Sequence, residues 1–94
     1  MINLGLGKAI VTFIKSADKR TLLIENNVWD TLEGRHDIVV FSINLDFNPE
    51  LAKFYNVSKL PTTFFIKNGD EKLRHQGMLT KIAVNKLIKK HLDD

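Results

Sequence analysis

The sequence predicts an α/β fold in which a four-stranded mixed sheet and three helices follow in the order βαβαββα. Two observations support this prediction. Apolar, β-branched runs alternate with segments of helical periodicity, an order typical of βαβ units. In addition, Asn68-Gly69 separates two strand-like segments, and Asn-Gly favours the type I′ turn of a hairpin. A parallel pair joined by a right-handed crossover, followed by an antiparallel hairpin, accounts for all the strands.

The first half of the chain predicts two strands joined by a helix. Residues 8–14 (KAIVTFI) are mostly apolar, which suits a central parallel strand covered on both faces. A helix is expected over residues 19–33, with Gly34 as its left-handed stop. Its predicted apolar stripe consists of Leu22, Ile24, Val28, Trp29 and Leu32. Residues 38–45 predict a second strand, also covered on both faces and lying at the sheet edge, where Asp37 and Asp46 favour protection over pairing.

The second half predicts a short helix, the hairpin and a last helix. Asn48-Pro49 combines an N-cap with a proline in the first helical position, and opens a helix through Tyr55. Strands are expected over residues 62–67 and 71–75. Thr80 is placed to cap the last helix. The residues expected on the core face of that helix are Val84, Leu87, Ile88 and Leu92.

The composition fits a single domain over residues 1–94. This length allows one hydrophobic core, and the balance of 44% hydrophobic and 27% charged residues is that of a globular protein. No apolar run approaches the length needed to cross a bilayer, and residues 1–8 lack the pattern of a signal peptide. We therefore expect a cytoplasmic protein without membrane contact. A net charge of +3 without an aromatic stacking platform does not favour nucleic acid as a partner.

Three segments resemble the thioredoxin family. Residues 59–70 (KLPTTFFIKNGD) are similar to that family's strand, cis-proline and Asn-Gly hairpin. Residues 44–49 (NLDFNP) resemble the entry to its next helix, and residues 75–80 (HQGMLT) the lead into its final helix. The resemblance implies a thioredoxin-like fold with a cis Leu60–Pro61 bond. Because only seven residues precede the first strand, it implies a minimal domain, close in outline to a glutaredoxin.

The chain contains no cysteine, although the family carries a CxxC dithiol at the start of the first long helix. By resemblance, the two cysteine positions fall on Asp18 and Thr21. The family's buried aspartate and the lysine that pairs with it align with Thr12 and Ser42. Neither a carboxylate nor a hydroxyl can form a disulfide, so dithiol exchange is excluded. The resemblance therefore implies a redox-inactive member that is not an enzyme.

The expected binding surface lies beside the proline, where members of the family hold extended client segments. By resemblance, the backbone N–H and C=O of Leu60 face this groove and are free for strand addition. The binding residues expected in and around this cis-proline groove are Ala17, Asp18, Lys19, Arg20, Leu60, Pro61, Gly77 and Met78. We therefore predict a subunit that binds a protein or peptide partner. The alternative for Pro61 itself is that it only fixes the turn into the hairpin.

The start of the first helix supports a second functional hypothesis. Asp18 is placed to cap the helix, while Lys19 and Arg20 follow beside free amides, an arrangement able to hold a phosphate or carboxylate. A thiol-independent enzyme or an anion-binding protein using residues 18–21 is therefore the alternative, although solvated surface charge is the simpler explanation of the two cations. No catalytic residue, metal site or cofactor is predicted, because the three histidines are scattered and no phosphate loop or nucleophile motif occurs.

Overall fold

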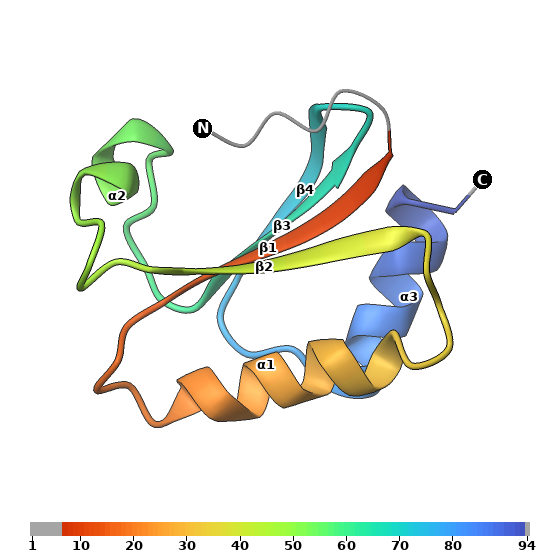
Figure 1. Ribbon diagram of the computed structural model, residues 1–94, viewed down its shortest axis with the longest axis horizontal. Coiled ribbons are helices and arrows are strands. Elements are labelled where there is room, and N and C mark those ends of the chain that lie inside the picture. The colour runs from red at the N-terminus through yellow and green to blue at the C-terminus, as the bar shows by residue number, and fades with distance from the viewer. Residues whose placement is uncertain (1–6, 94) are drawn as a thin grey trace.

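The computed structural model describes residues 7–93 as a four-stranded sheet with helices on both faces (Figure 1). The strands are β1 (Lys8–Ile14), β2 (Ile38–Asn44), β3 (Thr62–Lys67) and β4 (Asp70–Gln76). The helices are α1 (Arg20–Thr31), α2 (Glu50–Phe54) and α3 (Lys81–His91), which confirms the predicted βαβαββα order. None of the helices described here is long and apolar enough to span a membrane. The cytoplasmic location stays a prediction.

The strands lie in the order β2-β1-β3-β4. β1 pairs in parallel with β2, from Lys8 opposite Ile38 to Ile14 opposite Asn44, and antiparallel with β3. The hairpin between β3 and β4 turns at Asn68 and Gly69, whose φ angles of 52° and 84° are the positive values that a type I′ turn requires. Within residues 7–93, β2 is therefore an edge strand, as predicted.

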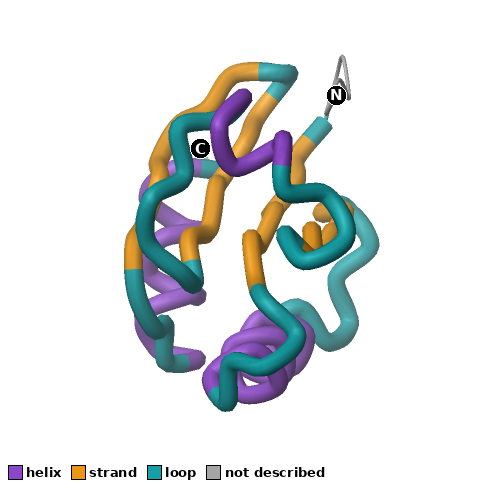
Figure 2. The backbone as a smooth tube through the Cα atoms, turned by 90° about the vertical axis from the view of Figure 1, so that its left-hand side faces the viewer, coloured by secondary structure: helices purple, strands orange, loops and turns teal. Residues whose placement is uncertain are grey.

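Side chains alternate along β1 between two hydrophobic cores. Ile10 and Ile14 belong to the core under α1 and α3, whereas Val11 and Phe13 belong to the core on the α2 side. Figure 2 shows the strands between α1 at the bottom and α2 above. The first core is closed by buried residues of α1 and of the α3 segment, namely Ile24, Val28, Leu32, Val84, Ile88 and Leu92. The second core is covered only in part, because α2 has a single short apolar face.

Two predictions of burial are wrong. Leu22 and Trp29 were expected in the core, but their side chains are 67% and 57% exposed, because α1 contacts only one face of the sheet and buries a narrower stripe than predicted. The predicted cover of β2 on both faces is also wrong. Val39 and Phe41 are 49% and 39% exposed, since the five residues of α2 do not reach over this strand.

Predicted signals mark several of the helix ends, but the predicted N-cap at Asn48 is wrong. The N-cap of α2 is Pro49, without a side-chain cap bond, and Asn48 Nδ2 donates to the carbonyl of Asn44. Thr80 caps α3, and its hydroxyl accepts a hydrogen bond from the backbone N–H of Ala83 at 3.1 Å. Gly34 follows α1 with φ 82°, and Asn56 follows α2 with φ 57°. In α3, Val84, Ile88 and the following Leu92 are fully buried, whereas Leu87 is only partly buried.

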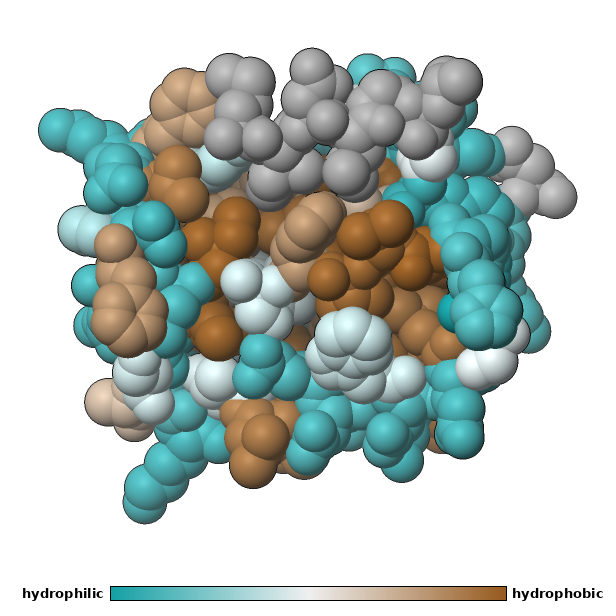
Figure 3. Space-filling view, viewed as in Figure 1, coloured by the Kyte–Doolittle hydropathy of each residue, from teal (hydrophilic) through white to brown (hydrophobic). Residues whose placement is uncertain are grey.

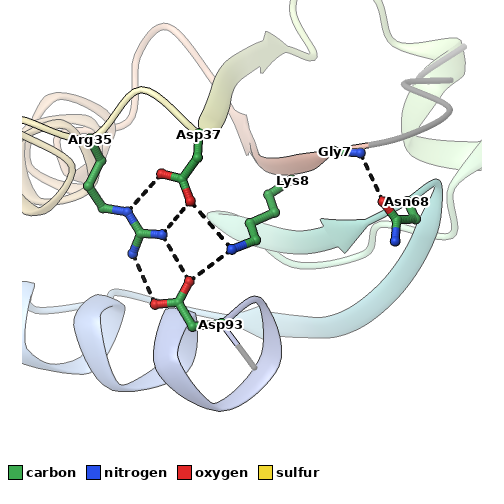
Figure 4. A network of polar contacts seen from close by, with 6 residues as sticks. All are labelled: Gly7, Lys8, Arg35, Asp37, Asn68 and Asp93. Atoms are coloured by element: carbon green, nitrogen blue, oxygen red, sulfur yellow. Dashed lines mark hydrogen bonds and ion pairs between the residues drawn. The ribbon is translucent and has the colours of Figure 1, made fainter.

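A network of ion pairs joins the starts of β1 and β2 to the end of α3 (Figure 4). The guanidinium of Arg35 lies 2.6 Å from a carboxylate oxygen of Asp37 and 2.9 Å from one of Asp93. Lys8 Nζ lies 3.1 Å from Asp93 and 3.4 Å from Asp37. Hydrogen bonding to Arg35 is the main reason that the pKa of Asp37 is strongly lowered and that of Asp93 falls to about 2. The network therefore holds the carboxylates in their charged form.

Candidate functional site

The first turn of α1 is closed by a contact between two neighbouring side chains. Asp18 Oδ1 accepts hydrogen bonds from the backbone N–H and from Nε of Arg20, at 2.9 and 3.0 Å. Arg20 Nη2 donates to Asp18 Oδ2 at 2.6 Å, and these contacts hold the pKa of Asp18 at about 2. The predicted N-cap is displaced by one residue, because helical φ and ψ begin at Lys19, which makes no side-chain cap bond. Asp18 still satisfies one amide of the first turn.

The loop before α1 is fixed to its surroundings by side-chain hydrogen bonds. Thr21, which the resemblance places at the second cysteine position of the family, donates its hydroxyl hydrogen to the carbonyl of Lys15 at 2.7 Å. The backbone N–H of Ser16 donates to Asp46 at 2.9 Å, and Asn44 Nδ2 donates to the Ser16 hydroxyl at 2.6 Å. The loop is therefore tied to the end of β2.

These contacts leave few side chains at the start of α1 available for anion binding or catalysis. Arg20 is already paired with Asp18, so one of the two cations expected to hold an anion has a partner within the chain. Neither Asp18 nor Thr21 contacts a histidine base within residues 7–93. In the same described range, no group of histidine and acidic residues has the geometry of a metal site. The anion-binding alternative stays a prediction that no contact favours.

The segment before β3 presents free backbone groups. The Leu60–Pro61 peptide bond is cis, and the carbonyl of buried Pro61 accepts a hydrogen bond from the backbone N–H of Gly77 at 2.7 Å. The Thr62 hydroxyl donates to the carbonyl of Lys59. Between these bonded residues, the N–H and C=O of Leu60 have no hydrogen-bond partner in the part of the chain that is described. Among residues 59–61, Leu60 is therefore the residue whose N–H and C=O are both without a partner in the described chain.

The predicted binding residues lie at one end of the sheet but do not form one pocket. Phe13 pairs with Thr62, and Thr62 pairs with Gln76, so the loop after β1, the start of β3 and the end of β4 share that end. Gly77 is bonded to Pro61, whereas the side chain of Leu60 packs against the core on the α2 side and that of Met78 against the core under α1. No ion pair or hydrogen bond found in residues 7–93 joins residues 17–20 to Leu60 or Met78.

A hollow of about 420 Å³ adjoins Leu60 on the α2 side of the sheet. Its lining residues are Lys15, Leu45, Asp46, Pro49, Ala52, Val57, Ser58 and Leu60. Of the eight predicted binding residues, only Leu60 lines it. The other seven lining residues were not predicted, although Leu45, Asp46 and Pro49 belong to the segment 44–49 that resembles the family. The sequence does not show that α2 turns this segment toward Leu60.

A second hollow, of about 490 Å³, lies at the opposite end of β3. Its lining is polar and consists of Lys67, Asn68, Asp70, Lys72, Lys90 and His91. It shares no residue with the predicted site. Exposed lysines around a hairpin are ordinary solvated charge, so this hollow adds no second candidate.

Comparison with known proteins gives consistent matches. The family model for thioredoxin matches residues 23–90. Thioredoxin from Chlamydia trachomatis is 35% identical over 54 residues, which are 57% of this chain and 53% of that protein. The chloroplastic M-type thioredoxin of Spinacia oleracea is 36% identical over 55 residues, which are 58% of this chain and 30% of that protein. The chain thus spans about half the length, or less, of these relatives.

Solved structures extend the likeness over nearly the whole chain. Thioredoxin-2, described as a component of malaria parasite protein secretion machinery, superposes with a TM-score of 0.86 at 22% identity, covering 97% of this chain and 89% of that one. A thioredoxin-like protein from Clostridium perfringens gives a TM-score of 0.79 at 20% identity, covering 93% of this chain and 71% of that one. At these identities the structural likeness shows the fold alone.

Proposed function

Since this chain belongs to the thioredoxin family and contains no cysteine, we propose that it is a redox-inactive subunit that binds an extended segment of another protein beside Pro61. The predicted resemblance and the thioredoxin-like fold are confirmed. Dithiol exchange requires two sulfur nucleophiles, and this chain has none. The family membership therefore leaves binding, rather than electron transfer, as the activity to be explained.

The observation that supports this proposal most directly is the unpaired backbone of Leu60. The carbonyls of its two neighbours accept hydrogen bonds, that of Lys59 from Thr62 and that of Pro61 from Gly77. Within residues 7–93, neither the N–H nor the C=O of Leu60 has a partner. In strand addition, such main-chain groups supply affinity to any extended segment. Each hydrogen bond made there contributes about 1 kcal/mol net. Two bonds would give weak binding, so side-chain contacts must add to them.

The hollow on the α2 side supplies such contacts. Its lining includes the apolar residues Leu45, Ala52 and Val57 beside Leu60, together with the charged residues Lys15 and Asp46. The volume of about 420 Å³ has room for a large apolar side chain of a client segment. The lining offers few convergent polar groups, which makes it less suited to a free metabolite. We propose a client that places its backbone along Leu60 and an apolar side chain in this hollow.

The hydrogen bonds of Asp18 and Thr21 favour binding over catalysis at the start of α1. Asp18 is bonded to Arg20, and Thr21 to Lys15, so the two former cysteine positions already have partners. An activated nucleophile would need an adjacent base, and the described contacts provide none at Asp18 or Thr21. The proposed role therefore uses no cofactor and no catalytic residue.

A peptide selection tests the proposal. The immobilised full chain is exposed to a phage-displayed library of random peptides, and the enriched peptides are titrated into ¹⁵N-labelled protein. We expect the amide signal of Leu60 to shift most. Ala52→Trp, which fills the hollow, should weaken binding by about tenfold or more, since an anchor side chain loses its pocket.

Two charge substitutions locate the binding surface. Met78→Asp should weaken binding, because Met78 lies next to Gly77 at the same end of the sheet and a new carboxylate there repels apolar contacts. Lys89→Glu, on the outer side of α3, is the control and should change affinity little. Binding that survives Ala52→Trp and Met78→Asp but is lost with Lys89→Glu would place the interface on α3 and contradict the proposal.

A further inference from the structure

The outer edge of β2 carries an apolar surface that no described element covers. Within residues 7–93 no strand pairs with this side of β2, and Val39 and Phe41 are 49% and 39% exposed. In Figure 1, β2 runs across the front of the molecule; in the same view, Figure 3 shows hydrophobic side chains gathered in the middle of this face and hydrophilic ones around them. Natural edge strands usually carry a charge or a proline, and β2 (IVVFSIN) has neither.

The acidic residues at the two ends of β2 are not free charges that protect the edge against strand pairing. Asp37 is bonded to Arg35 and lies 3.4 Å from Lys8, so its charge is balanced within the chain. Asp46 accepts a hydrogen bond from the backbone N–H of Ser16 at 2.9 Å, which ties it to the loop before α1. The expected protection of this edge by Asp37 and Asp46 therefore rests on carboxylates that already have partners.

We propose that β2 pairs antiparallel with β2 of a second copy of this chain, so that one sheet continues across both copies. On the α2 side of the sheet, β2 carries three apolar residues centred on Phe41, namely Val39, Phe41 and Ile43. With Phe41 on the two-fold axis, Val39 lies opposite Ile43 of the second copy, and Phe41 lies opposite its own counterpart. The axis is perpendicular to the sheet, so these apolar side chains stand on the same face and cover one another. Self-pairing therefore matches each of these three apolar residues with another apolar residue.

The residues that flank the strand are complementary in the same register. Beyond the ends of β2, counting in the same register brings His36 toward Asp46 of the second copy, and both residues are exposed. An imidazole facing a carboxylate is a favourable pair, and no two like charges are placed opposite each other between residues 36 and 46. The flanking residues therefore do not oppose pairing with a second copy.

The neighbouring side of α1 adds two further apolar residues. Glu25 of α1 accepts a hydrogen bond from the Ser42 hydroxyl of β2 at 2.6 Å, which fixes the side of the helix that faces this edge. Leu22 and Trp29 lie on that same side, three residues before and four after Glu25. In the proposed pair the two α1 helices lie on one face of the sheet, one on each side of the two-fold axis. The exposure of Leu22 and Trp29 then has an explanation.

The oligomeric state of the full chain tests this proposal. Sedimentation velocity over a hundredfold range of concentration should show a dimer that dissociates on dilution. Val39→Lys and Phe41→Lys should each raise the dissociation constant by about tenfold or more, because they place like charges near the two-fold axis. Ile82→Lys is the matched control, since Ile82 is 71% exposed on α3, and it should leave the dimer intact. Far-UV circular dichroism checks folding, and Val39→Lys carries the test if Phe41→Lys does not fold.

Cross-linking tests the register, and the absence of cysteine in the chain makes it specific. Opposed residues of antiparallel strands have Cβ atoms about 5 Å apart, within reach of a disulfide after a small adjustment. Phe41→Cys should therefore form a covalent dimer under mild oxidation, and Ile82→Cys should not.

Three results would each overturn the proposal: a monomer at every concentration, a dimer that survives both lysine substitutions, or equal cross-linking of the two cysteine variants.

Discussion

Thr63 offers a test of the core in which a substitution should stabilise the protein. The residue lies in β3 with no exposed surface, and among residues 7–93 no partner is found for its buried hydroxyl. By strand alternation its side chain lies on the same face as Phe65, in the core under α1 and α3. A buried hydroxyl without a partner costs about 1–3 kcal/mol. Thr63→Val keeps the β-branched shape and removes that cost, so we expect the free energy of unfolding to rise by about 1 kcal/mol.

The preceding residue provides a matched control of opposite sign. Thr62 is equally buried in the same strand, but its hydroxyl donates to the carbonyl of Lys59. Thr62→Val removes this hydrogen bond, whose net contribution is about 1 kcal/mol, and should lower the free energy of unfolding. Two neighbouring Thr→Val substitutions should therefore change stability in opposite directions.

Thermal unfolding followed by circular dichroism measures both variants. For a chain of this size, about 1 kcal/mol corresponds to a change of about 4–8 °C in Tm, well above experimental error. If Thr63→Val destabilises the protein as much as Thr62→Val, the Thr63 hydroxyl has a partner in solution, such as a buried water, and the reasoning is refuted.

Two further predictions concern charge and redox chemistry. Hydrogen bonding to Arg35 and Lys8 lowers the pKa of Asp93 from 3.8 to about 2. The stability that this network contributes is therefore present in full above about pH 4 and is lost as the pH falls toward 2. Unfolding measured as a function of pH should show this loss in the unmodified protein and a smaller loss in Arg35→Met. The unmodified protein should show no turnover in an insulin reduction assay. The double variant Asp18→Cys with Thr21→Cys should form a disulfide and gain slow turnover, because the two positions lie one helical turn apart at the start of α1. Turnover by the parent, or a double variant that cannot form the disulfide, would contradict this account.

The local signals in the sequence predicted most of the fold. Strand alternation, the Asn-Gly turn and the Thr80 cap each depend on a few adjacent residues, and the structure places them as expected. Burial was harder to predict, because it depends on what covers a side chain. Trp29 and Phe41 have core-like chemistry, yet the described chain has no element above them.

The candidate site was predicted only in part for the same reason. The unpaired backbone of Leu60 follows from a local motif, and the structure shows it. The hollow beside it depends on where α2 lies relative to β3, and Ala52 and Val57 carry no mark of this in the sequence. The pairing of Arg20 with Asp18 was equally hidden, because a side chain two residues away can turn toward either neighbour or solvent.

The position of β1 in the sheet bears on how the protein folds during synthesis. β1 is the first described strand to leave the ribosome, yet it lies between β2 and β3, and its antiparallel partner ends at Lys67. Its core under α1 is closed later still, by Leu92. A nascent chain that stops before Thr62 thus exposes one edge of an apolar central strand. Contacts so distant in sequence form slowly, so the domain must fold as a unit after most of it has been translated.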